Sequence, residues 1–452
     1  MLIAQKFAEF IEQTNYETLA PETVAITKER ILDTIGSALA GCASWEYRDQ
    51  FLAACRNLGN GDSSILCSQK REFPAAVAAM IIATFAHAIE LDDGHKNAGV
   101  HAGAVVVPTA LAMGEKLGSD GKDIIAAVAI GYEIVYRIAS HVNPMQIQKG
   151  FHPSGNCDTF GAMAVAGKLL GLNKEQLANG LGFAGLSASG LMEATQSGQK
   201  SKCVQVGRAA YNGILAAYMA QMGLDGTTTI FEGKTGFFNA QSEDVDVEDV
   251  CRDLGKVFTI GDTYSKLYPT CRHSQPAIEA VLDTVAEEGF GYEEVEFVNV
   301  GTHQVAYDLT GTIYQPGDAG EAKFSLPYGV ALALNEHSVG VRHMTPEYWD
   351  NPVNKELAAL VKVCVDPEVQ AKFPGERGAR VEIGLKDGRR FTRECYDLKG
   401  SPNNPIGWAE LAVKFVGNAA GVIPKANAEQ LMKVIADLEN RRNVTEIIEL
   451  LK

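Results

Sequence analysis

Regular cysteine spacing is absent from this sequence. Its nine cysteines are spread over 452 residues without a C-x-x-C pair, which argues against a disulfide framework or a zinc-binding cysteine motif. Long hydrophobic runs are also absent, because the most apolar stretch, residues 75–89, is shorter than the ~20 residues of a membrane span and ends at Glu90. Residues 1–16 follow an amphipathic helix pattern, not that of a secretion signal. We therefore expect a cytoplasmic protein that does not enter a membrane.

Positive charge is scarce as well. Lys and Arg total 40 against 56 Asp and Glu, which gives a formal net charge of −16. Such a surface repels nucleic acids and anionic membranes, so we expect neither as a partner. An anionic substrate stays compatible with this charge, because a few cations inside a cleft can dominate the local potential.

Helical periodicity fills the chain up to about residue 262 and returns after about residue 405. Ala and Gly are frequent in these patterns, and small residues let helices approach closely. The main helical patterns lie at 74–90, 104–117, 121–141, 158–171, 173–190 and 207–222. A chain of this length is expected to form two domains, and these segments predict a helical one.

The intervening region, 263–400, has a different texture. A strand pattern ends near Thr302, and Val381, Ile383 and Leu385 alternate with polar residues. Asp387-Gly388 then predicts a tight hairpin turn before a second strand at 391–396. With helical patterns at 276–289 and 328–336, this region is predicted to be a smaller α+β domain, and the tail from about 405 to pack on the helical one.

Five stretches place polar residues among apolar or small neighbours. They are Glu90–Gly103, Gly150–Gly155, Gly198–Arg208, Ser265–His273 and Ala322–Tyr328. In the first, carboxylates and histidines could form a capping loop, a catalytic pocket or a metal site. The second contains a histidine whose backbone is fixed by the following proline, and the third places basic residues at the start of a helix. The fourth lies at the expected domain junction, and the fifth leads into a helix with proline in its first turn. Together they supply the groups that an acid/base enzyme for anions needs.

Five motifs in this order resemble the MmgE/PrpD family over essentially the whole chain. They are D-D-x-H…H-x-G (Asp92, Asp93, His95, His101, Gly103), G-x-H-P-[ST] (Gly150, His152, Pro153, Ser154), T/S-K-x-x-x-x-G-x-A (Ser201, Lys202, Gly207, Ala209), K-x-[YF]-P-x-C (Lys266, Tyr268, Pro269, Cys271) and A-[KR]-F-S-x-x-Y (Ala322, Lys323, Phe324, Ser325, Tyr328). The family includes 2-methylcitrate dehydratase, cis-aconitate decarboxylase and iminodisuccinate epimerase.

The resemblance implies a mostly α fold with an α+β part. A large helical domain would be formed by both chain ends, 1–262 and 401–452, with an inserted α+β lid domain, 263–400. It also implies a homodimer and a cleft site without a cofactor, so we expect no metal. We expect catalytic roles for His101, His152, Lys202, Lys266 and Tyr328, and substrate contacts from Glu90, Asp93, Arg272, His273 and Gln205.

The favoured function is a lyase acting on a small di- or tricarboxylate, of the 2-methylcitrate dehydratase type. Decarboxylation of a cis-aconitate-like acid and epimerisation of an iminodisuccinate-like acid are alternatives, and a non-catalytic scaffold is the least favoured. Three positions depart from the family pattern, namely Glu90 in place of Asp, Gly94 in place of Thr and Gln205 in place of His. Which histidine acts as acid and which as base is left open.

Overall fold

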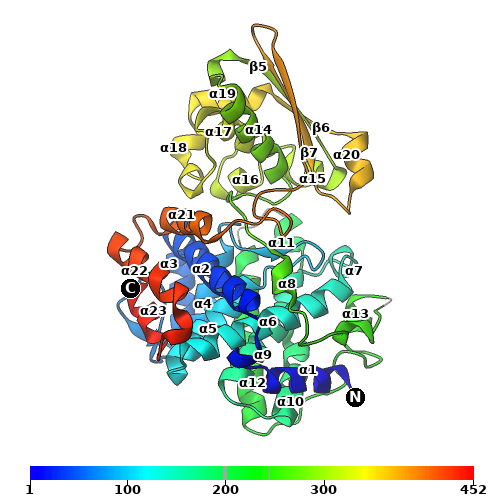
Figure 1. The fold of residues 1–452 in the computed structure, drawn as a ribbon, viewed down its shortest axis with the longest axis vertical. Helices are drawn as coiled ribbons and strands as arrows, with labels where there is room; N and C mark the ends of the chain where they lie inside the picture. Colours follow the sequence, from blue (N-terminus) through cyan, green and yellow to red (C-terminus); the bar gives the residue numbers. More distant parts are fainter. Residues whose placement is uncertain (197–200, 244) are drawn as a thin grey trace. The chain divides into compact units, whose positions relative to one another are not determined.

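The chain folds into two compact units. The computed structural model describes residues 1–196, 201–243 and 245–452 (Figure 1). The first unit comprises Met1–Ala88, Asp92–Ser265 and Gly407–Lys452, and the second comprises Ile89–Leu91 and Lys266–Ile406. The first is helical and is built from both chain ends, and the second combines helices with a sheet, so the predicted fold class is confirmed.

The centre of the first unit is a stack of apolar helices. Its main members are α2 (Pro21–Ser44), α4 (Ala75–His87), α5 (Gly103–Leu117), α6 (Gly121–Val142), α9 (Asp158–Leu169) and α12 (Lys202–Gln221). Glycine sets the closeness of α4 and α12, since a Cβ at Gly207 would lie 2.6 Å from the carbonyl oxygen of Met80. Helix α6 is long and apolar enough to span a membrane, but 89% of its apolar window is buried inside the protein, as in a core helix.

Shorter elements complete this unit. The helix α1 packs on α10, and α21 packs on α2. There are two small antiparallel pairs: β1 with β2, which are close in sequence, and β3 with β4, which come from distant parts of the chain. The bounds are α1 (Ile3–Gln13), α3 (Arg48–Arg56), α7 (Met145–Gln148), α8 (Pro153–Asn156), α10 (Lys174–Ser187), α11 (Glu193–Gln196), α13 (Phe237–Gln241), α21 (Trp408–Ala419), α22 (Lys425–Ala436), α23 (Thr445–Leu450), β1 (Ser63–Ser64), β2 (Arg71–Phe73), β3 (Gly94–His95) and β4 (Thr263–Tyr264).

The second unit is built on a four-stranded sheet in the order β6-β5-β7-β8. The strand β5 (Val295–Thr302) is parallel to β6 (Val361–Val365) and antiparallel to β7 (Ala379–Leu385). The predicted hairpin joins β7 to β8 (Arg390–Cys395), with Gly388 at φ +90° in the turn. The remaining helices are α14 (Gln275–Glu288), α15 (Gln304–Thr310), α16 (Ala319–Lys323), α17 (Leu326–Asn335), α18 (Pro346–Trp349), α19 (Pro352–Leu360) and α20 (Pro367–Lys372).

Helices α14, α17 and α19 supply most of the helical core of this unit. Helix α14 packs on β7, β8 and α17, and α19 packs on α17. The strands alternate as predicted, so that Val298, Val300, Val381 and Ile383 are buried among helix residues such as Ile278. Half-buried strands of this kind gain their stability from that packing.

Candidate active site

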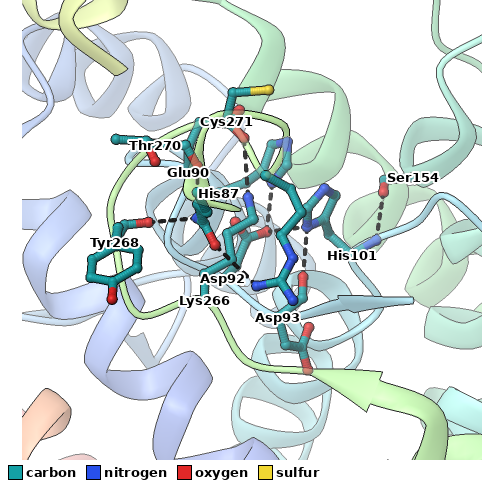
Figure 2. Close-up of polar contacts among 12 residues, drawn as sticks. His87, Glu90, Asp92, Asp93, His101, Ser154, Lys266, Tyr268, Thr270 and Cys271 are labelled. Carbon is teal, nitrogen blue, oxygen red and sulfur yellow. Dashed lines mark hydrogen bonds and ion pairs between the residues drawn. The ribbon is translucent and has the colours of Figure 1, made fainter. Parts of the chain in front are cut away.

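The histidine–carboxylate cluster of the first unit lies in the connection between α4 and α5. His87 ends α4, and its Nδ1 lies 2.6 Å from Oδ2 of Asp92, while Nδ1 of His101 lies 3.4 Å from the same oxygen (Figure 2). His87 and Asp92 are buried. An ionised carboxylate only accepts hydrogen bonds, so His87 donates through Nδ1. Asp92 thus holds one histidine and places negative charge beside the other.

His101 has a defined tautomer. Its Nδ1 lies 2.6 Å from the backbone carbonyl oxygen of Asp93, and its backbone N–H donates to Oγ of Ser154 at 2.9 Å (Figure 2). A carbonyl oxygen cannot donate, so Nδ1 must carry a hydrogen. The neutral ring therefore has its lone pair on Nε2, which can accept a proton.

His152 has its donor and acceptor sides fixed by the next helix. It is the N-cap of α8, and its Nδ1 accepts the backbone N–H of Gly155 at 3.3 Å. Pro153, at the first helical position, holds the preceding residue in an extended backbone conformation. With Nδ1 as acceptor, the neutral ring carries its hydrogen on Nε2. The ring centroid of His87 lies 4.9 Å from that of His101 and 6.1 Å from that of His152.

Asp93 turns inward, away from this cluster. Its carboxylate accepts from the Tyr132 hydroxyl and, at 3.2 Å, from the backbone N–H of Gly103. Burial raises the pKa of Asp93 to about 7, although the nearby Arg30 guanidinium opposes the shift. These contacts anchor the loop that carries His101. The predicted substrate contact of Asp93 stays a proposal, and the contacts favour an indirect role.

Gln205 also acts on the site through the backbone. From the first turn of α12 its Oε1 accepts the N–H of Leu191 at 2.6 Å and its Nε2 donates to the Leu191 carbonyl at 3.1 Å. The adjacent Gly190 carbonyl accepts the N–H of His152 at 3.0 Å. Gln205 therefore clamps the segment that holds His152. Lys202 is the first residue of α12, while Gly198–Lys200 of the same predicted stretch lie outside the described residues.

In the second unit, Lys266 and Glu90 form a buried ion pair. The Lys266 Nζ lies 3.2 Å from Oε2 of Glu90, and the two side chains are 1% and 9% exposed (Figure 2). Glu90 has φ +55°, a left-handed conformation that side-chain-bearing residues adopt at a cost. Glu90 lies in residues 89–91, a short segment that is grouped with the second unit although the residues before and after it belong to the first unit.

The other predicted residues of this unit have partners of their own. Arg272 donates to Oε1 of Gln275 at 3.0 Å and to Oγ of Ser401 at 2.8 Å. The buried Tyr328 hydroxyl donates to the His343 carbonyl at 2.6 Å, and burial raises the pKa of this tyrosine. This contact supports a structural role for Tyr328, and its catalytic role stays a proposal.

One residue set could hold a divalent ion. Donor atoms of His87, Asp92 and His101 lie within 4.8 Å of one another, and two imidazoles with a carboxylate form a common zinc ligand set. In the arrangement observed, the 2.6 Å contacts of His87 and His101 each use Nδ1–H as a hydrogen-bond donor, so each neutral ring keeps its lone pair on Nε2. His95, considered from its spacing, instead accepts the N–H of Ala98 at 3.0 Å. The geometry supports a hydrogen-bonded cluster.

Comparison with known proteins defines the class. Residues 5–249 match the MmgE/PrpD N-terminal domain, and residues 268–440 match the MmgE/PrpD C-terminal domain. The chain therefore belongs to the MmgE/PrpD family, as the five motifs predict.

Its curated relatives include several decarboxylases. Cis-aconitate decarboxylase of Mus musculus is 24% identical over 463 residues, with 100% of this chain and 93% of the relative covered. The Homo sapiens enzyme is 24% identical over 464 residues, with 100% and 94% covered. The Aspergillus terreus enzyme is 25% identical over 455 residues, with 94% and 90% covered. Cis-aconitate decarboxylases are lyases.

Proposed function

We propose that this protein is a cofactor-independent lyase for a small di- or tricarboxylate, and that it removes water from a 2-methylcitrate-like acid. The observation that supports this most strongly is the state of His101. Its Nδ1–H is held by the Asp93 carbonyl, and the Asp92 carboxylate lies 3.4 Å from the same nitrogen. A carboxylate beside Nδ1 stabilises the imidazolium that forms when Nε2 takes a proton. This is the arrangement of a general base.

The proposed elimination uses the two histidines differently. Nε2 of His101 takes the proton from a carbon next to a carboxylate, the electron pair forms a carbon–carbon double bond, and the carbon–oxygen bond breaks. The imidazolium of His101 then returns the proton to the departing hydroxyl, which leaves as water. His152, with its hydrogen on Nε2, donates a hydrogen bond that stabilises negative charge on the substrate.

Carboxylate binding is assigned to Lys202, Lys266 and Arg272. The protein has a net charge of −16, so a polyanion must be attracted by local cations. Lys202 begins α12, where the positive end of the helix dipole adds to the positive potential. We keep Glu90 and His273 as substrate contacts, with Glu90 acting through its ion pair with Lys266.

Decarboxylation of cis-aconitate is the second candidate, because it is the reaction named for the relatives. In this reaction the carbon–carbon bond to a carboxylate breaks, CO₂ leaves, and the resulting carbanion needs a proton. His101 would then start as the imidazolium and act as the acid. Epimerisation would need proton removal and return at one carbon, without loss of water or CO₂.

Product analysis in D₂O distinguishes these reactions. The purified protein is incubated with 2-methylcitrate, citrate or cis-aconitate, and water loss, CO₂ release and deuterium incorporation are followed by NMR. We expect His101→Gln to lower both water loss and C–H exchange by roughly a hundredfold or more, the usual contribution of a general base. His152→Gln should slow water loss but keep the exchange. The exposed His337 provides a matched control as His337→Asn, which should leave both rates unchanged.

Two results would overturn the proposal. If CO₂ were the only product, dehydration would be wrong and decarboxylation would replace it. If His101→Gln kept the wild-type rate of exchange, His101 would not be the base, whatever the reaction.

A further inference from the structure

The second unit contains a pair of histidines in direct contact. His303 follows β5 and is the N-cap of α15, where its Nδ1 accepts the backbone N–H of Ala306 at 3.3 Å. The ring of His303 stacks on Phe373, with centroids 4.2 Å apart and planes 17° apart. Nε2 of His303 lies 3.3 Å from Nδ1 of His273. The cap and the stack together hold the His303 ring in one orientation.

These contacts fix the direction of the hydrogen bond between the rings. Because Nδ1 of His303 accepts from Ala306, the neutral ring carries its hydrogen on Nε2. This hydrogen points to Nδ1 of His273, which must therefore accept. The hydrogen of His273 is then on its own Nε2, on the side of the ring opposite to His303.

Both rings are neutral at pH 7. Burial lowers the pKa of His273 well below its ordinary value, and the positive charges of Arg377, Arg272 and Lys266 lower it further. Burial and Arg377 lower the pKa of His303 to about 4. His273 therefore presents a neutral N–H group in cationic surroundings, which suits an anionic oxygen and not a cation.

We propose that His303 is a positioning residue that fixes His273 with its Nε2–H as a hydrogen-bond donor to a carboxylate oxygen of the substrate. The proposal rests on the proposed function for its ligand class, a di- or tricarboxylate. It adds a residue that none of the five sequence motifs contains. It also explains why His303 is a histidine, since Ser, Asp or Asn would cap α15 equally well but could not reach His273.

Nitrogen NMR of the ligand-free protein tests the tautomers directly. With ¹⁵N-labelled histidine, the coupling pattern of each ring shows which nitrogen carries the hydrogen, and the variant His273→Gln assigns the His273 signal. We expect an Nε2–H tautomer for His273 at pH 7 and a mixture of tautomers in His303→Asn. An Nδ1–H tautomer or an imidazolium in the wild type would overturn the proposal, as would an unchanged tautomer in the variant.

The same variant separates positioning from capping. His303→Asn keeps a good N-cap for α15 and loses the donor to His273 together with the ring stack on Phe373, so Phe373→Leu serves as the control for the stack. We expect its Kd for cis-aconitate or 2-methylcitrate to rise about tenfold, the scale of one hydrogen bond to a charged group. Its melting temperature should stay close to that of the wild type. Phe373→Leu, which removes only the stack, should have a smaller effect. Unchanged affinity in His303→Asn would show that His303 is only a cap.

The two proposals fail in different ways. If the wild type binds and converts no di- or tricarboxylate, the proposed function fails and the ligand assigned to His273 fails with it. The tautomer measurement needs no substrate, so it still decides whether His303 positions His273.

Discussion

Replacing Lys266 with methionine separates the two roles that this lysine could have. Methionine fills a similar volume without charge, and the change removes the cation 3.2 Å from the Glu90 carboxylate. Two unit charges at this separation attract by about 5 kcal/mol at an effective dielectric constant of 20. Breaking a buried pair costs about 3–5 kcal/mol in practice, because the remaining charge stays buried. We expect Lys266→Met to lower the free energy of unfolding by about this amount.

A double-mutant cycle shows whether the loss comes from the ion pair. In Lys266→Met with Glu90→Gln no charge remains at this position, so the double variant should regain most of the lost stability. Turnover should stay absent in both, because the substrate carboxylate has lost its cation. Lys122→Met is a matched control, since it breaks the exposed pair with Glu17 and should change neither stability nor turnover appreciably.

Urea unfolding followed by circular dichroism, together with turnover of the substrate, measures the wild type, Lys266→Met, Glu90→Gln, the double variant and Lys122→Met. Equal stability losses in the single and double variants would refute the coupling between Lys266 and Glu90. Recovery of wild-type turnover in the double variant would mean that Lys266 only neutralises Glu90 and does not bind substrate.

Three further results are expected. The pKa of Asp93 is raised from 3.8 to about 7 in the folded state. Between about pH 4 and pH 7 the folded protein keeps the proton on this carboxyl group while the unfolded chain loses it, so the free energy of unfolding should fall as the pH rises through this range. This contribution is about 1.4 kcal/mol per pH unit and should be missing in Asp93→Asn, and equal urea-unfolding slopes against pH in the two proteins would refute it. In Gly207→Ala the new Cβ would lie 2.1 Å from Oγ1 of Thr84, and thermal unfolding should show a loss of about 1–3 kcal/mol unless α4 and α12 separate without cost. Turnover should survive exhaustive chelation, whereas activity that returns only with one divalent ion would assign a metal to His87, Asp92 and His101.

Much of the fold could be predicted because periodicity reports burial. The hairpin could be predicted from the alternation of apolar and polar residues on either side of Asp387-Gly388, and the structure has the turn at this position. Helix α12 starts at Lys202 and not at 207, because Cys203 and Val206 extend its buried face by one turn. The strand β6 alternates as a strand should, but its parallel pairing with β5 depends on a crossover that local patterns do not specify.

The polar contacts of the site were less predictable. His87 ends an apolar helix and resembles a core residue, and its contact with Asp92 depends on the loop that contains the left-handed Glu90. His303 follows a buried strand and meets His273 from a distant part of the chain. Sequence motifs single out His101 and His152 as candidates, but their tautomers follow from single backbone contacts, to Asp93 and Gly155, that no residue pattern encodes.

The segment Ile89–Leu91 limits how the second unit can be exchanged between relatives. It is grouped with residues 266–406 although it lies inside the first unit's sequence. A chimaera that takes residues 266–406 from a relative would keep Glu90 and its left-handed backbone but would replace Lys266, the partner of Glu90 in the buried ion pair. A relative's residue without a positive charge at this position would leave the Glu90 carboxylate buried without its cation. Recombination or engineering must therefore transfer residues 89–91 and 266–406 together. Across the family, the residues at positions 90 and 266 are expected to covary.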